Sequence, residues 1–399
     1  MFLFTEMKYH LTRNKGRSLL MIAAALALLG AMAFYLGGLG ANQTALNELG
    51  EKIPVTVRIV TEDASRRDGL FISTATHDAF IETGLRDIRA TTSAAGCWSE
   101  AARAQEPFAG GDVTMVGLNS LHALPLSRVE YTYAQGVDGS LFEGTEGLCV
   151  LESSFAEENG LALGDEFSMP VYLYPYGMDY YSIGDLDLKV AGTFSAGQTG
   201  GISLLFPVEW LRAEVLAHEK KFFCYDSLSG VVAEPLELNA YKARLKEAGV
   251  KEPADHLEDE FAGETAVIED EVFTKTANKL RENIGAYRGF LLPFFGLIVL
   301  VSALVVFLVL RSSRHELAIA SSLGRPKVQS ALARLLAVLA LDLLGCIIAL
   351  PIMVGAAGIT LPTALLIGGL FLACGLVGSM VALALLLRFD TLTLLTKVD

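Results

Sequence analysis

Four long apolar runs constrain this chain more than any other feature, because each is long enough to cross a bilayer as a helix. They cover residues 18–41, 289–310, 335–357 and 362–387. About 20 apolar residues in a helix suffice to cross the roughly 30 Å of hydrocarbon in a bilayer. The pattern predicts a polytopic α-helical membrane protein with one plus three transmembrane helices and a large domain, residues 42–288, held on one side of the membrane.

Basic residues near the ends of the apolar runs predict the orientation, since Lys and Arg are retained on the cytoplasmic side of a membrane. The amphipathic leader, residues 1–17, carries four basic residues against one acidic residue, and the connection 311–334 carries five against one. Both segments are therefore expected in the cytoplasm, and four spans return the tail, residues 388–399, to the same side. We expect a multi-pass protein of the cell (plasma) membrane with both termini cytoplasmic.

The outer block is strongly acidic. Residues 42–288 contain 40 acidic and 20 basic side chains, a net charge of −20 in a chain whose total is −14. Such a surface repels nucleic acid and anionic headgroups, so no nucleic-acid partner is expected. Two interpretations of the charge remain open: solubility of an external domain, or attraction of a basic ligand.

Hydrophobic periodicity and turn residues predict an α+β fold for the outer block, which is long enough for two subdomains. A helix is expected over residues 151–163, with Ser153 or Ser154 as its N-cap. The last helix of the block runs into the second span and predicts a rigid stalk. The other predicted elements are a helix at 42–50 continuing the first span, strands at 55–60, 167–174, 186–194 and 202–206, and helices at 237–248 and 270–287.

Cysteine usage does not suggest a disulfide scaffold. The outer block holds Cys97, Cys149 and Cys224, so at most one disulfide can form within it and one thiol is left over.

Tyrosines concentrate in one short stretch, since residues 171–181 hold five of the twelve in the chain. Exposed tyrosines combine flat apolar area with a polar tip, which suits contact with a peptide or a sugar. We therefore predict ligand contact at Tyr172, Tyr174, Tyr176 and Tyr180. The alternative interpretation is a hairpin whose alternate residues pack on a neighbouring strand.

The sequence offers little for catalysis. Asp342 is the one charged residue inside the four apolar runs. A structural role is expected for it, in reach of water or of Arg334, and the alternative is that it carries protons or binds a partner chain. His315 and Glu316 lack the second histidine of H-E-x-x-H, and no G-x-x-x-x-G-K-[ST] sequence occurs. The acidic run 256–260 lacks the spaced ligands of a calcium loop. We expect the chain not to be an enzyme and to bind no metal or cofactor itself.

Several segments resemble the FtsX-like permease family, the MacB type of ABC transporter. The run L-T-R-N-K-G-R-S-L-L at 11–20 resembles the family's entry to its first span, and R-H-E-L-A-I-A-S-S-L-G at 314–324 looks like its cytoplasmic segment R-x-E-[IL]-[AG]-[IL]-x-x-x-[LM]-G. In the outer block, G-L-A-L-G-D at 160–165 and V-A-G-T-F at 190–194 are similar to the family's external domain. The tail fits loosely, because the usual proline after Asp390 is missing.

This resemblance implies a permease (transmembrane) subunit that works with a separate ABC ATPase (nucleotide-binding) subunit, on which ATP and Mg²⁺ would be bound. It also implies a second permease copy or a paralogue, in membrane lipid. ATP-driven motion would pass through the stalks by mechanotransmission, to export or extract a peptide, drug or lipid-linked substrate. The residues implied in ATPase coupling are Arg314, Glu316, Leu317, Ala318, Ile319, Leu323 and Gly324.

Two other functions remain open. The external domain of an FtsX-like protein can regulate an extracytoplasmic cell-wall hydrolase or a sensor, although that domain is normally much smaller than this one. The acidic outer block and its tyrosines would also suit a non-ABC membrane receptor or adhesion protein. Absence of a co-purifying ATPase would favour the receptor.

Overall fold

The protein forms two compact units in the computed structural model, which describes residues 15–104, 111–123, 126, 129–174, 181–195, 200–217, 222–254, 259–312, 327–355 and 358–387. One unit, here called the helical unit, combines residues 1–48 and 276–399, and the other, the α+β unit, comprises residues 49–275. The α+β unit is therefore inserted between the first helix and the rest of the helical unit.

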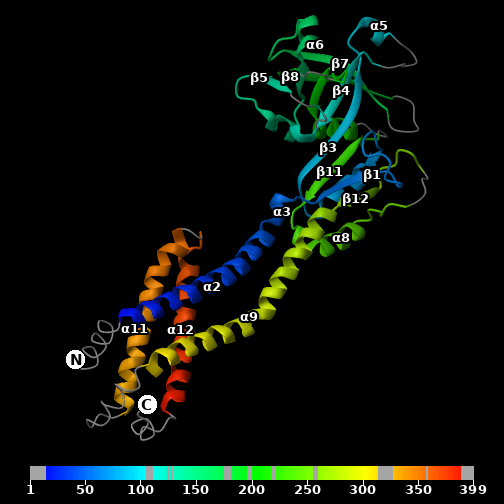
Figure 1. Cartoon of the computed structure of the whole chain (residues 1–399). Helices are drawn as coiled ribbons and strands as arrows, with labels where there is room; N and C mark the ends of the chain where they lie inside the picture. The colour runs from blue at the N-terminus through cyan, green and yellow to red at the C-terminus, as the bar shows by residue number, and fades with distance from the viewer. Residues whose placement is uncertain are drawn as a thin grey trace. The chain divides into compact units, whose positions relative to one another are not determined.

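Four helices of the described chain are long and apolar enough to span a membrane. They are α2 (Lys15–Asn47), α9 (Glu271–Ser312), α11 (Lys327–Gly355) and α12 (Leu361–Leu387) (Figure 1). The predicted order, one apolar helix, a large α+β region and three more apolar helices, is confirmed.

Helices α2 and α9 extend well beyond their apolar runs. Helix α2 continues to Asn47, and α9 runs from Glu271 through the second apolar run without a break. At 1.5 Å per residue, the 42 residues of α9 correspond to a length of about 63 Å. Pro293 lies inside α9, where it cannot donate a backbone hydrogen bond to the preceding turn.

The four helices pack as a bundle around apolar side chains. Its main cluster draws Leu29 and Met32 from α2, Ile298 from α9 and Phe371 from α12, all at most 3% exposed. Small residues let the backbones approach. A Cβ built on Gly378 would lie 2.9 Å from the carbonyl oxygen of Val299 in α9, so only glycine fits there without moving a helix.

The α+β unit is built on one ten-stranded sheet and a two-stranded ribbon, β10 with β2. The helices of this unit are α3 (Leu49–Lys52), α4 (Thr74–Ile81), α5 (Glu100–Arg103), α6 (Ser153–Glu158), α7 (Val208–Ala217) and α8 (Leu238–Glu247). The strands are β1 (Thr56–Val60), β2 (Ile72–Ser73), β3 (Leu85–Gly96), β4 (Val113–Leu118), β5 (Glu130–Tyr133), β6 (Leu148–Glu152), β7 (Glu166–Leu173), β8 (Tyr181–Ser195), β9 (Leu204–Pro207), β10 (Cys224–Tyr225), β11 (Ser227–Val232) and β12 (Thr265–Glu269).

Part of the large sheet closes into a ring. The order β3, β4, β9, β6, β8 and β7 returns to β3, because β7 pairs with both β8 and β3. The first half of β3 instead pairs with β11, which continues through β1 to β12. Strand β3 thus belongs to a small open sheet at one end and to the ring at the other (Figure 1).

Alternation of side chains explains why these segments are strands. In β8, Ile183, Leu186 and Leu188 are at most 5% exposed, whereas Asp185 and Asp187 between them face solvent. The register of β8 with β7 shifts by one residue near Gly184, whose φ of +114° a residue with a Cβ rarely adopts.

Some expected elements differ from the structure. The helix expected over residues 151–163 is wrong in extent, since α6 covers only Ser153–Glu158. Its N-cap is Glu152, whose carboxylate accepts from the Phe155 N–H at 2.9 Å, and neither Ser153 nor Ser154 has this role. Residues 151 and 152 belong to β6, where pairing with β8 and β9 outweighs local helix preference. Strand β3 was not predicted.

All five cysteines are free thiols. Cys97 and Cys149 are fully buried in the α+β unit. Burial raises the pKa of both thiols, so neither is an activated nucleophile.

Candidate functional site

The segment expected to couple to an ATPase lies outside the described residues. Helix α9 ends at Ser312 and α11 begins at Lys327. Arg314, Glu316 and Leu323, with the other residues of that segment, fall between them. Their role therefore stays a prediction.

The tyrosine stretch is partly described. Strands β7 and β8 pair antiparallel, with Leu173 opposite Tyr181, as the hairpin interpretation expects. Val171 and Leu173 are buried, whereas Tyr172 is half-buried and Tyr174 is 56% exposed. Tyr172 therefore lies on the outer face of β7, and Tyr174 directly follows the last residue of that strand. Tyr176 and Tyr180 lie outside the described residues, so ligand contact at this stretch stays a prediction.

Asp342 lies inside the helical bundle. It is 5% exposed, and its Oδ2 has no hydrogen-bond partner among the described residues. That oxygen faces α12, since a Cβ built on Gly375 would lie 3.1 Å away. Packing of α12 over the carboxylate buries it, and the expectation that Asp342 reaches water or Arg334 stays a prediction.

Buried hydroxyl groups accompany Asp342 in the bundle. Ser302 and Ser379 are also buried in the bundle, and the Ser379 hydroxyl donates to the Gly375 carbonyl at 2.6 Å. Hydrolysis at a serine needs a base within hydrogen-bond reach of its hydroxyl, and this hydroxyl is already occupied. Within the described residues, no three His, Cys, Asp or Glu side chains gather as metal ligands.

A polar network joins α4, α7 and β10 in the α+β unit. The Arg212 guanidinium contacts Asp78 Oδ2 at 2.7 Å and donates to the Tyr225 hydroxyl at 3.1 Å. That hydroxyl donates in turn to Glu209 at 2.8 Å, and the His77 ring stacks on Tyr225 at 4.1 Å. Every charged group here has a partner, so the network is a structural clamp between elements distant in sequence.

The stability that the clamp contributes depends on pH through the Asp78 carboxyl. The hydrogen bond from the Arg212 guanidinium to the Asp78 carboxylate, with a smaller effect of His77, holds the pKa of Asp78 below its usual value of 3.8. A carboxyl whose folded-state pKa is depressed contributes stability at pH values above its unfolded pKa, and loses it as the pH falls through the folded value. The clamp is thus intact at neutral pH.

Asp226, between β10 and β11, has the opposite behaviour. Burial raises the pKa of its carboxyl to about 6, with a further contribution from Asp68, although hydrogen bonds from Ser93 oppose the shift. A raised folded-state pKa means that stability is greatest below the unfolded value of 3.8 and falls until the pH passes about 6. We therefore expect Asp226→Asn to stabilise the α+β unit by about 1–2 kcal/mol at pH 7.5, and much less at pH 4.5.

Urea unfolding of the full chain at the two pH values measures this difference. Both tryptophans, Trp98 and Trp210, lie in the α+β unit, so their fluorescence follows that unit alone. The matched control is Asp185→Asn, which removes an exposed carboxylate on β8. An equal gain in unfolding free energy from both variants, or a gain that does not depend on pH, would contradict a raised pKa for the Asp226 carboxyl.

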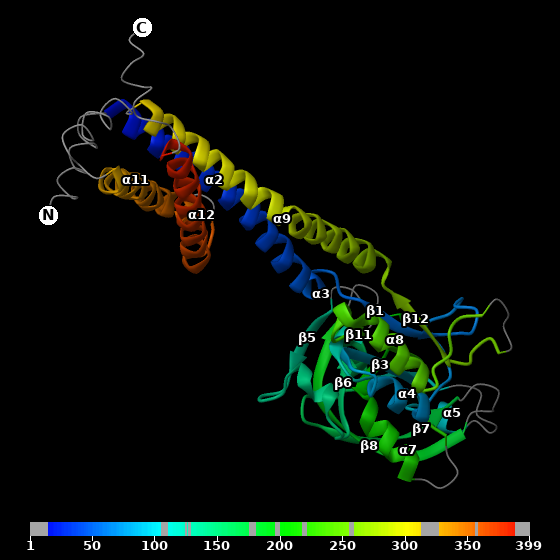
Figure 2. The same cartoon turned by 90° about the horizontal axis from the view of Figure 1, so that it is seen from below.

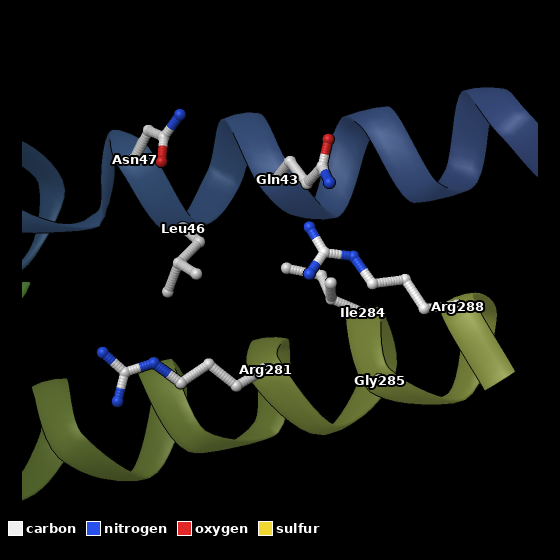
Figure 3. A pocket seen from close by; sticks show the side chains of 7 residues that line it. All are labelled: Gln43, Leu46, Asn47, Arg281, Ile284, Gly285 and Arg288. Carbon is white, nitrogen blue, oxygen red and sulfur yellow. The ribbon is translucent and has the colours of Figure 1, made fainter.

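A cleft of about 480 Å³ lies between α2 and α9. Gln43, Leu46 and Asn47 line it from α2, and Arg281, Ile284, Gly285 and Arg288 line it from α9. We call it the stalk cleft. Figure 3 shows Arg288 extending across the gap toward the turn of α2 that carries Gln43. Both arginines are exposed, whereas Ile284 is 8% exposed and closes the apolar floor.

Aromatic contacts hold α2 and α9 together directly beside the stalk cleft. The Tyr35 hydroxyl donates to the Tyr287 carbonyl, and the Tyr35 ring stacks on Phe294 at 4.1 Å. Gly38 leaves room for the Tyr287 hydroxyl, which lies 2.9 Å from where a Cβ would be. Figures 1 and 2 both show the two helices side by side.

The stalk cleft is not among the sites predicted from the sequence. A usable signal was present, since Arg281 and Arg288 are seven residues apart in the predicted stalk helix and therefore share one face. The opposite wall comes from a helix more than 200 residues earlier, and no local pattern links the two. No protein-family model matches this chain, and no curated protein matches it significantly.

Proposed function

We propose that this chain is the membrane-spanning permease subunit of an ABC-type machine, which moves its α+β unit by mechanotransmission when a separate ATPase subunit hydrolyses ATP. Its α+β unit would be extracytoplasmic and both termini cytoplasmic. The machine would export or extract a peptide, drug or lipid-linked substrate. The observation that carries the proposal is the unbroken helix α9, from Glu271 to Ser312.

The exposed surface of the bundle supports insertion in a membrane. Large apolar side chains face outward on all four helices, among them Phe34 (81%), Leu292 (84%), Ile347 (58%) and Leu366 (58%). In water, each of these side chains would leave apolar area unburied, at a free-energy cost of about 25 cal/mol per Å² of that area. Lipid removes this cost, so the bundle is suited to hydrocarbon rather than to water.

The form of α9 supports transmission of movement. One end of this helix adjoins the segment 313–326, where the resemblance places ATPase contact. The other end follows β12 directly, with Asp270 between them. A displacement of the end of α9 at Ser312 would therefore be carried along one continuous helix to Glu271, close to the end of β12 at Glu269. Contacts of Tyr35 with Tyr287 and Phe294 would make α2 follow α9.

The proposal predicts a separable ATPase contact. We expect Leu323→Asp to lower the amount of ATPase recovered with the tagged full chain at least tenfold, because a buried charge at a coupling contact costs several kcal/mol. A detergent pull-down with mass spectrometry of soluble proteins measures it. Leu163→Asp is the matched control, since Leu163 is 44% exposed in the α+β unit and should leave recovery unchanged.

Two results would overturn the proposal: no ATPase with the wild-type chain under mild detergent, or equal recovery with Leu323→Asp. The first would favour a membrane receptor or adhesion protein, the alternative motivated by the acidic outer block and by the tyrosines Tyr172 in β7 and Tyr174 just after it. A recovered ATPase whose activity does not respond to any transported compound would favour the regulator of a cell-wall hydrolase.

A further inference from the structure

One polar layer crosses the helical bundle between two apolar clusters. Both clusters draw side chains from α2, α9, α11 and α12. On α11, Val338 belongs to one cluster and Cys346 to the other, and Asp342 lies between them, about one turn from each. On α9, Ser302 lies in the same way between members of the two clusters. The layer is therefore a local exception in an apolar interior.

The carboxyl group of Asp342 and the hydroxyl group of Ser302 converge on α12. A Cβ built on Gly375 would lie 3.1 Å from Asp342 Oδ2 and 4.0 Å from Ser302 Oγ. The Ser379 hydroxyl is engaged within α12 itself, because it donates to the Gly375 carbonyl at 2.6 Å. Asp342, Ser302 and Ser379 are all buried, so the layer is closed in the packed bundle.

The other helices bring little charge to this layer. The titratable groups at this level of α11 and α12 are the thiols of Cys346 and Cys374, both free. Helix α9 contributes the Ser302 hydroxyl, and α2 contributes apolar side chains. Arg334 lies eight residues before Asp342 on α11, about 12 Å along the helix axis. Among the described residues, Asp342 Oδ2 has no hydrogen-bond partner.

A proton would suit this layer better than a charge. A buried carboxylate without a partner costs so much free energy that such a group takes up a proton and becomes neutral instead. The protonated carboxyl gains one O–H donor, and the Ser302 hydroxyl in the same layer has lone pairs that can accept. The layer then holds two neutral hydrogen-bonding groups in place of an uncompensated charge.

We propose that Asp342 is a proton-binding site, which holds a proton while α12 covers the carboxyl group and releases it when α12 moves away. On release, the carboxyl O–H bond breaks, its electron pair stays on the carboxylate, and the proton passes to water that enters between the helices. Asp342 lies seven residues inside the apolar run 335–357, about 10 Å from its cytoplasmic end in the proposed orientation. The inference rests on the membrane insertion proposed above but not on the ATPase.

Infrared spectroscopy of the purified full chain in detergent detects the bound proton, because a protonated carboxyl group and a carboxylate absorb at different frequencies. We expect the difference spectrum between wild type and Asp342→Asn at pH 7.5 to contain the carbonyl band of one protonated carboxyl group. The matched control is Asp185→Asn, which removes an exposed carboxylate from β8 and should change only the carboxylate bands. A carboxylate band for Asp342 as well would overturn the proposal and would fit an ionised group that reaches water or Arg334.

Heating the same proteins at pH 6 and at pH 9 tests the release. If the packed bundle binds one proton more than the unfolded chain, its stability falls as the pH rises. Between these pH values, we expect the midpoint of helix loss, followed by circular dichroism, to fall by about 4 °C or more for wild type relative to Asp342→Asn. Asp185→Asn should behave as wild type.

Two results of the heating experiment would overturn the proposal. Equal shifts with pH in wild type and Asp342→Asn would mean that no proton leaves this carboxyl group when the helices separate. An Asp342→Asn chain that fails to fold would show that a charge is needed at this position.

Membrane insertion is measured apart from both experiments. Wild-type chain that resists alkaline extraction from membranes but lacks the band of a protonated Asp342 would end the inference and leave insertion intact. Chain released by alkali would end both.

Discussion

Replacing Phe206 by alanine is expected to lower the free energy of unfolding of the α+β unit by about 3–5 kcal/mol. Phe206 is fully buried in β9, the strand of the ring that lies between β4 and β6. Its ring packs edge-on against Trp210 at 5.9 Å and covers Gly117, which would place a Cβ only 2.7 Å from it. Truncation would leave a cavity between backbones fixed by pairing on both sides, which cannot collapse to fill it.

Urea unfolding of the full chain followed by tryptophan fluorescence tests this, because both tryptophans belong to the α+β unit. The Phe206 variant changes the native signal through Trp210, so the transition midpoint and slope are compared, not the amplitude. Phe222→Ala is the matched control. Its side chain is 57% exposed, and a change within about 0.5 kcal/mol is expected. Similar losses of unfolding free energy for both variants would show that the interior of the closed ring of strands is not the core of this unit.

Gly378→Leu is expected to disrupt the helical bundle, with a cost of about 3 kcal/mol or more. The atoms nearest to a Cβ at Gly378 are the Val299 oxygen at 2.9 Å and the Ala303 nitrogen at 3.0 Å, both in the backbone of α9. Backbone atoms of a helix cannot rotate away, so α9 and α12 must separate. Their separation would also expose Asp342 and Ser302, which α12 covers.

Gly369→Leu makes the same chemical change on the same helix, where a Cβ meets nothing within 4 Å. It should leave the bundle intact. Gel filtration of the full chain in detergent, with circular dichroism during heating, distinguishes the two. We expect early loss of helicity and aggregation for the Gly378 variant only. Equal heat resistance of both variants would mean that α9 and α12 do not pack as closely as 3 Å contacts require.

The two pairs of variants also separate the two units experimentally. The Phe206 variant should unfold the α+β unit without changing the elution of the detergent-bound helices, and the Gly378 variant should do the reverse. If α9 transmits movement between them, then Gly378→Leu should abolish transport or signalling while the tryptophan transition stays in place. That combination would support the proposal that the bundle acts on the α+β unit through α9.

The apolar helices were predictable because their signal is local. A run such as residues 18–41 needs no partner to be identified, since length and composition alone decide whether it can span hydrocarbon. The same holds for the continuation of the predicted stalk 270–287 into the second run, which α9 confirms. Strand β7 was also predicted close to its observed bounds, whereas β8 begins at Tyr181, five residues before the strand expected at 186–194.

Other features depended on residues distant in the chain. Strand β3 was missed because its sequence L-R-D-I-R-A-T-T-S-A-A-G has little apolar alternation, and it is held by pairing with β11, β4 and β7. The helix expected at 151–163 was too long for a similar reason, since β8 and β9 draw its first residues into β6. Pairing partners override local preference wherever a strand is central.

The sequence by itself determined the division of this protein into four apolar helices and one large acidic α+β region, because hydropathy and charge act residue by residue. Only the tertiary structure decided that Asp342 is buried against Gly375, that β7 closes a ring and that residues of α2 and α9 line one cleft. Each of these depends on backbones meeting across long stretches of chain, which no local pattern encodes.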